Sequence, residues 1–336
     1  MWVAIPFALA GVSVDRRPTS WRASECGECH TAEHAEWQTS RHAVASTNPT
    51  FTASWENWPN GWCLECHAPL EVSQKARLGV PAVAGNIHRL PTAPPGEAWN
   101  EGVNCAACHL REGSVLSSRP SPAAPHPITV EPGLSDGSLC QQCHEFTFQN
   151  HTPKAPFSKG DTPAQATFSE WQSSNAAAEG TGCVDCHMGP VGHRFPGAHT
   201  PSLVKSALRV EVVRRKREVT ATLSAPHAPH RIPTGDPFRR LVLEICDDES
   251  CENPTVSHTL RRVFAPNETT WELVEDRTLP PETTDTPSVR TWTFLVKGRP
   301  RHWRLRYFYG DPQFESQLPA AEVSTTIDEG IIKETP

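Results

Sequence analysis

The sequence contains five copies of the pattern Cys-x-x-Cys-His, which together hold ten of its twelve cysteines. Two thiols at this spacing can form thioethers with both vinyl groups of one porphyrin, and the next residue then lies under the iron as an axial imidazole ligand. The motifs therefore predict five covalently attached c-type haems. The attachment residues are Cys26, Cys29, Cys63, Cys66, Cys105, Cys108, Cys140, Cys143, Cys183 and Cys186, and the proximal ligands are His30, His67, His109, His144 and His187.

Zinc ribbons and disulfide scaffolds also use closely spaced cysteine pairs. The chain has 16 histidines among 336 residues, so a histidine at any given place is about a one-in-twenty event. A histidine directly after each of the five Cys-x-x-Cys pairs therefore favours haem attachment over the other two interpretations. The remaining pair, Cys246 and Cys251, has no adjacent histidine, and we expect it to close a short loop as a disulfide, because thioether formation implies an oxidising compartment.

The net charge of −7 makes nucleic acid an unlikely partner. The basic run from Arg214 to Arg217 lies between two stretches of strand character, which predicts a solvated hairpin turn. Met1 to Val12 resembles the apolar part of a secretory signal, so we expect residues 1–23 to be a signal segment and linker. The mature chain is then periplasmic, extracellular or at the cell surface.

The five motifs occupy residues 26–187, which leaves about 32 residues per haem and predicts that the haems share walls and form the core of this region. We expect a multihaem cytochrome c fold of sparse short helices and coil around stacked haems. Helices are predicted at residues 31–45, 138–149 and 163–178, the last with Thr162 as N-cap and Gln165 completing a capping box. Proline-rich loops are predicted at 91–95, 120–127 and 153–163.

From about Leu203 the pattern changes to short alternating runs rich in Val, Thr and aromatic residues. Seven such runs predict an antiparallel β-sandwich, which we expect to be a structural cap or docking module. The predicted organisation is a pentahaem cytochrome domain at 24–202 and a β-sandwich domain at 203–336. The runs cover residues 208–213, 219–223, 240–246, 258–264, 271–274, 289–296 and 303–309.

Each iron needs a second axial ligand or an open site. The chain has only two methionines, and Met188 directly follows a proximal histidine, so methionine ligation is nearly excluded. Eleven histidines lie outside the motifs, which predicts bis-histidine coordination and low reduction potentials. Of these we expect His34 to be exposed, and His258 and His302 to be structural.

Several stretches resemble multihaem cytochromes related to the tetrahaem cytochrome of ammonia oxidisers and to octahaem hydroxylamine oxidoreductases. They are Trp37 to His42, Gly102 to His109 with His126 downstream, Cys183 to His199, and His230 to Asp236. The resemblance implies that His42, His126 and His230 are distal ligands. We count His88, His193 and His199 as further distal candidates.

The hydroxylamine enzymes need an open haem and a crosslinking tyrosine, whereas the two tyrosines here, Tyr307 and Tyr309, lie in the β-domain. That activity is not implied. We expect an electron carrier rather than an enzyme, which relays electrons between donor and acceptor cytochromes or from a membrane-associated quinol-oxidising complex. Two alternatives stay open, a reductase of a nitrogen or sulfur oxyanion with one open haem, and a subunit of a self-assembling cytochrome wire.

Overall fold

The computed structural model describes residues 22–57, 61–70, 100–111, 114–152, 155–189, 191–268 and 270–335. The signal segment (apart from its last two residues), the loop at 91–95 and the candidate ligand His88 lie outside them. The chain forms two compact units, Met1–Leu139 with His187–Phe195, and Cys140–Cys186 with Pro196–Pro336. Among the described residues, no helix combines the length and apolar character needed to cross a membrane.

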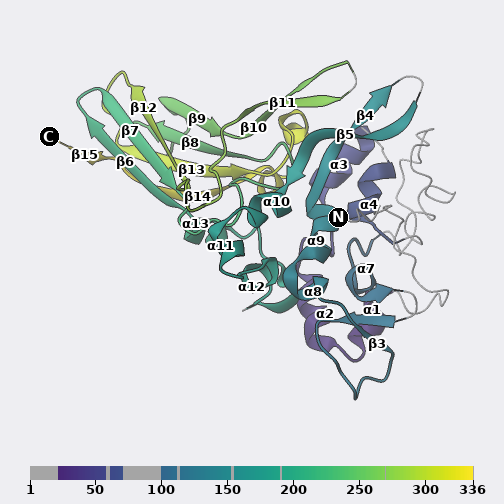
Figure 1. Ribbon diagram of the computed structural model, residues 1–336. Helices are drawn as coiled ribbons and strands as arrows, with labels where there is room; N and C mark the ends of the chain where they lie inside the picture. Colours follow the sequence, from purple (N-terminus) through teal and green to yellow (C-terminus); the bar gives the residue numbers. More distant parts are fainter. Residues whose placement is uncertain are drawn as a thin grey trace. The chain divides into compact units, whose positions relative to one another are not determined.

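The first unit consists of short helices joined by turns and coil (Figure 1). Its described apolar residues form three small clusters, around Trp55 and Leu64, around Leu70 and Ala106, and around Trp37 and Ala43. The pattern fits the prediction that aliphatic packing does not fill this region. Its elements are α1 (Ala23–Gly27), α2 (Thr31–Gln38), α3 (Pro49–Asn57), η1 (Gly61–Cys63), α4 (Leu64–His67), α7 (Cys105–His109), β1 (Leu110–Arg111), β2 (Ser114–Ser117), β3 (Ile128–Val130), α8 (Gly133–Asp136) and η2 (Gly192–Arg194).

The predicted helix at 31–45 ends at Gln38, where turns follow. The helix α9 (Ser138–His144) ends five residues before the predicted position, because strand β4 (Glu145–Thr152) begins there. The predicted helix at 163–178 and the predicted loop at 153–163 are both wrong in part. Strand β5 (Ala155–Ala166) pairs with β4 through most of that loop, and α10 (Thr167–Gln172) and α11 (Asn175–Ala178) follow it.

The second unit continues with α12 (Cys183–His187), which reaches its boundary, and α13 (Pro201–Ala207). Strands β6 (Arg209–Arg215), β7 (Glu218–Ser224), β12 (Val289–Leu295) and β15 (Lys333–Glu334) form one four-stranded sheet in the order β12-β7-β6-β15. Strands β8 (Arg240–Cys246), β9 (Val256–Leu260), β13 (His302–Phe308) and β14 (Ser324–Ile331) form a second in the order β14-β13-β8-β9.

Residues of both four-stranded sheets belong to one hydrophobic cluster. Val219 and Leu223 come from the first sheet, and Leu243 and Leu305 from the second, and all four side chains are fully buried. Alternation of apolar and polar residues explains β7 and β13, whose inward positions are buried in turn. Within these two four-stranded sheets, neighbouring strands pair antiparallel except β15 and β6, which run parallel.

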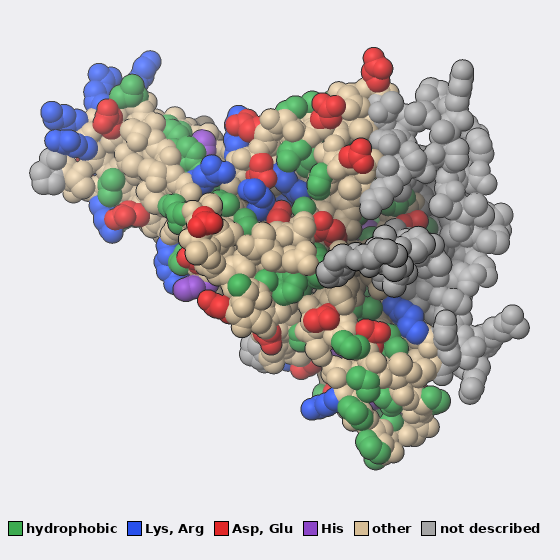
Figure 2. Space-filling view, viewed as in Figure 1, with side chains coloured by type: hydrophobic (Ala, Val, Ile, Leu, Met, Phe, Trp, Pro, Cys, Tyr) green, Lys and Arg blue, Asp and Glu red, His purple; other side chains and the backbone are tan. Residues whose placement is uncertain are grey.

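The predicted strand at 258–264 is two strands, because Arg261 separates β9 from β10 (Arg262–Pro266), which pairs with β11 (Trp271–Asp276) instead. The basic run forms the predicted β6–β7 hairpin turn, with Lys216 at a positive φ of 56°. Arg215, Lys216 and Arg217 are exposed, and Figure 2 shows Lys and Arg side chains at that end of the unit. Arg214 instead is buried and forms an ion pair with Glu334.

Candidate haem-binding sites

Four of the five motifs lie on one turn of helix or on two adjoining short helices. The third, fourth and fifth fall on α7, α9 and α12, and the second on η1 and α4. The first begins at the end of α1, continues through a turn and ends at His30, the N-cap of α2. A helical turn brings the two cysteines of a motif to one side, with the histidine beside them. Cys246 and Cys251 form the predicted disulfide, and none of the ten motif cysteines is in one.

The third motif shows how the sequence fixes this local geometry. Asn104 is the N-cap of α7, and its side-chain oxygen accepts hydrogen bonds from the backbone N–H groups of Ala106 and Ala107, at 3.1 and 3.3 Å. Both alanines are buried, since small residues between the cysteines let the turn pack closely. Gly102, at a φ of 53°, approaches the His42 carbonyl so closely that a Cβ would lie 2.4 Å from its oxygen.

Two pairs of predicted ligands face each other in the first unit. The ring centroids of His30 and His126 lie 6.4 Å apart, and those of His109 and His193 lie 6.2 Å apart. Two imidazoles bound to one metal ion through bonds of about 2.0–2.1 Å have centroids roughly 6.3 Å apart. Both pairs therefore have the separation needed to hold an iron between them, which supports the fit of a haem.

His126 and His193 are in different local environments. The Nδ1 atom of His126 is buried and has no hydrogen-bond partner among the described residues. The backbone N–H of His193 donates to Glu36 at 3.0 Å, and burial, with His109 nearby, lowers the pKa of the His193 ring. Gly192 has a φ of 59°, and a Cβ there would collide with the Glu36 carboxylate, so glycine is required for this contact.

His42 lies near the proximal histidines of two motifs. Burial, together with the neighbouring His187 and His67 rings, lowers its pKa to about 4. The Phe195 ring packs edge-on against His42, with centroids 4.6 Å apart. A buried, neutral imidazole between other imidazoles is the state that iron ligation requires.

Two of the predicted proximal ligands contact a backbone carbonyl oxygen through Nδ1. The Nδ1 atom of His67 lies 2.9 Å from the Ala45 carbonyl oxygen, and that of His109 lies 2.9 Å from the Leu116 carbonyl oxygen. A carbonyl acceptor fixes a hydrogen on Nδ1 and leaves Nε2 for a metal. These acceptors lie 22 and 7 residues from their histidines and follow no sequence motif.

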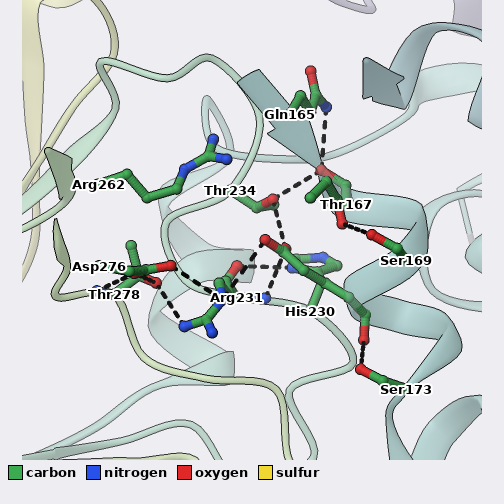
Figure 3. Close-up of polar contacts among 12 residues, drawn as sticks. Gln165, Thr167, Ser169, Ser173, His230, Arg231, Thr234, Arg262, Asp276 and Thr278 are labelled. Atoms are coloured by element: carbon green, nitrogen blue, oxygen red, sulfur yellow. Dashed lines mark hydrogen bonds and ion pairs between the residues drawn. The ribbon is translucent and has the colours of Figure 1, made fainter. Parts of the chain in front are cut away.

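Two more predicted ligands lie in the second unit. The Nδ1 atom of His144 is 3.0 Å from the Gln165 side-chain nitrogen, and the Nδ1 atom of His230 is 3.0 Å from the Arg231 carbonyl oxygen (Figure 3). His199 instead stacks on Tyr309, with ring centroids 3.8 Å apart and planes 15° apart. The described residues contain no group of three or more His, Cys, Asp or Glu side chains placed to hold a metal ion.

No family model and no curated protein matches the chain. The crystal structure of a penta-heme cytochrome c552 from Thermochromatium tepidum matches it with a TM-score of 0.65 and 21% sequence identity, over 93% of this chain and 99% of that one. A superoxide reductase structure matches 38% of this chain and 87% of its own, with 12% identity and a TM-score of 0.18. The first likeness shows that the chain has the fold of a multihaem cytochrome c.

Proposed function

We propose that the chain is an electron-transfer protein that holds five covalently bound c-type haems. The observation that carries the proposal is the placement of His30 opposite His126 and of His109 opposite His193, at the separation of two axial ligands. The five attachment motifs and the multihaem fold support the same number of haems. When bound, each haem iron exchanges one electron between its ferric and ferrous states.

The distal ligands follow from the contacts of each histidine. We assign His126 to the haem of His30 and His193 to the haem of His109. His42 is assigned to His187, one of the two proximal histidines whose rings lower its pKa. His230 is assigned to His144, because its Nδ1 contacts the Arg231 carbonyl oxygen and the Arg231 backbone N–H donates to Glu170, which Thr234 and Thr167 connect to the Gln165 partner of His144.

The haem of His67 is then left with His88, which lies outside the described residues. His199 is not a ligand in this assignment, since it stacks on Tyr309. With two imidazoles on each iron and no methionine ligand, the haems have low reduction potentials. The carbonyls of Ala45 and Leu116 lower them further, because an acceptor on Nδ1 makes the imidazole a stronger electron donor.

The first and third haems are direct neighbours in this proposal. The side chains of Cys26 and Cys105 lie within hydrogen-bond reach of each other. The attachment points of two haems thus lie in contact although 79 residues separate them in the sequence. Short separation between redox centres is what electron hopping along one chain requires.

We assign haem binding to residues 24–202 and a supporting role to residues 203–336. Its two sheets pack as a β-sandwich, which the shared cluster supports, as does the contact of His258 on β9 with Trp292 on β12, whose ring centroids lie 4.5 Å apart. The protein is exported and exchanges electrons with other cytochromes or a membrane-associated quinol-oxidising complex. Thioether formation and the disulfide both suit an oxidising compartment.

Two measurements test the proposal together. Mass spectrometry of protein matured in a host that attaches haem should give the mass of the chain plus five haems. The EPR spectrum of the oxidised protein should contain only low-spin ferric signals. A colourless product would refute it, and a high-spin signal from one haem would favour a reductase with an open site instead.

A further inference from the structure

A line of hydrogen-bond contacts runs from the proximal histidine of the fourth motif to a buried carboxyl group. Figure 3 shows its part from Gln165 through Thr167 to Thr234. The Gln165 side-chain nitrogen lies 3.0 Å from His144 Nδ1 and 3.1 Å from Thr167 Oγ1. Thr167 Oγ1 lies 2.8 Å from Thr234 Oγ1, which lies 3.0 Å from Glu170 Oε2. All five residues belong to the second unit.

Iron binding decides the direction of the first bond. This step rests on the proposed function, in which His144 binds iron through Nε2. The neutral ring then carries its hydrogen on Nδ1, which must donate. An amide NH₂ cannot accept it, so the Gln165 amide turns to present its oxygen at the same place, an orientation that exchanges two atoms of nearly equal size.

The two threonines pass this direction along the line. The Gln165 oxygen is now an acceptor, so the Thr167 hydroxyl donates to it. Each hydroxyl has one hydrogen, and therefore Thr167 can only accept from Thr234. The hydrogen of Thr234 is then used, and its contact with Glu170 is a hydrogen bond only if the carboxyl group donates.

The surroundings of Glu170 are compatible with a neutral carboxyl group. Its side chain is 8% exposed, and burial raises its pKa. The Arg231 backbone N–H, which donates to Oε2 at 3.1 Å, and then Arg262, the Thr234 hydrogen bond and the Arg231 guanidinium act in the opposite direction. The Arg231 guanidinium has another carboxylate partner, because its Nε lies 3.2 Å from Asp276, nearer than the 3.9 Å to Glu170. Arg262 donates to the Gly235 carbonyl oxygen at 3.0 Å.

We infer that in the haem-loaded protein Gln165, Thr167 and Thr234 form one directed hydrogen-bond chain from His144 to a neutral Glu170. Gln165 is then the positioning residue of the fourth haem's proximal ligand. Glu170 is the terminal donor that holds the amide oxygen, through the two hydroxyls, in the accepting orientation. This line of hydrogen bonds fixes the orientation of the His144 ring and places no charged group beside the fourth haem.

Infrared spectroscopy and redox titration of the holoprotein test the inference. The wild type should show the C=O stretch of a protonated carboxyl group at neutral pH, shifted in D₂O and lost in E170Q. The E170Q variant keeps a donor towards Thr234, so the midpoint potential of the fourth haem should stay unchanged. In Q165L that potential should rise, because His144 loses the acceptor that strengthens its donation to iron. The fourth haem is assigned from the spectral change in H230M.

E145Q is the matched control, since Glu145 follows His144 directly and accepts two hydrogen bonds from Ser169, at 3.1 and 2.9 Å. Removing that charge should raise the fourth haem's potential. If E170Q raises it equally, or if the wild type lacks the protonated band, Glu170 is ionised and the inference is wrong, while an intact haem content leaves the proposed function standing.

If E170Q does not fold, T234V gives an independent test, because the carboxyl group loses its acceptor and its C=O band should shift. An unshifted band would contradict the chain. A wild-type protein without haem on Cys140 and Cys143 would overturn the proposed function itself, and the inference with it.

Discussion

His30 and His126 lie 96 residues apart in the sequence, and their rings face each other at 6.4 Å with planes inclined by 43°. His30 ends the first haem-attachment motif, directly before α2, and His126 lies between the short strands β2 and β3. Substituting His126 by glycine should leave one of the five haems without a distal ligand. The EPR spectrum should then gain one high-spin ferric signal, with four haems unchanged.

His227 offers the control for that substitution. Its side chain is 94% exposed and its φ is 69°, a conformation that asparagine tolerates. H227N should therefore keep the wild-type spectrum. A low-spin spectrum in the His126 variant would show that another residue ligates this iron.

The disulfide between Cys246 and Cys251 should stabilise the β region without affecting haem attachment. It closes a short loop with a sequence separation of 5, and restriction of the unfolded chain by such a loop is worth about 2 kcal/mol. The double variant C246A/C251A should lose about that much in guanidinium unfolding followed by circular dichroism. A reducing agent should destabilise the wild type and not the variant, while haem stays bound to both, since thioethers are not reduced by thiols.

Leu243 on β8 is fully buried in the cluster shared by the two sheets. Its replacement by alanine should cost about 2–5 kcal/mol of unfolding free energy. Leu273 on β11 is 41% exposed, and L273A should change the unfolding free energy by less than about 0.5 kcal/mol. Equal effects of the two substitutions would contradict a common core between the sheets.

His258 should make the β region less stable as the pH falls. Burial, and to a smaller degree Arg277, lowers its pKa below the ordinary value of 6.5. The unfolded chain therefore binds a proton at a higher pH than the folded one, and stability is lost as the pH falls through 6.5 towards the folded-state value. In H258F, whose ring can pack on Trp292 and Phe294, unfolding curves from about pH 7.5 to 5.5 should show a weaker dependence.

The sequence was most informative where one local rule decides the structure. Strand β8 has the predicted bounds, since Leu241, Val242, Leu243, Ile245 and Cys246 make a short, mostly apolar run between turns. Strand β14 was missed, because Ile327 is its one buried residue and the remaining positions read as polar loop. The predicted helix start at Thr162 was wrong for a physical reason. Gln165, which looked like part of a capping box, contacts His144 and Thr167 instead.

The proximal half of each haem site could be predicted because it is contiguous in sequence. The distal half could not be assigned, since its residues come from distant segments and no pattern shows which imidazole faces which. Glu36, which binds the backbone of His193 from 157 residues away, carries no sequence signal at all. The placement of Gly192 beside it is explained only once the carboxylate is seen to pack there.

The acceptors of His67 and His109 are main-chain oxygens, of Ala45 and Leu116. Every amino acid supplies such an oxygen, so replacing either residue leaves the bond in place as long as the local path of the backbone is kept. The orientation of the two histidine rings therefore does not depend on which side chain the acceptor residue carries. Substitutions at positions 45 and 116 can therefore accumulate without a change in how the His67 and His109 rings are oriented.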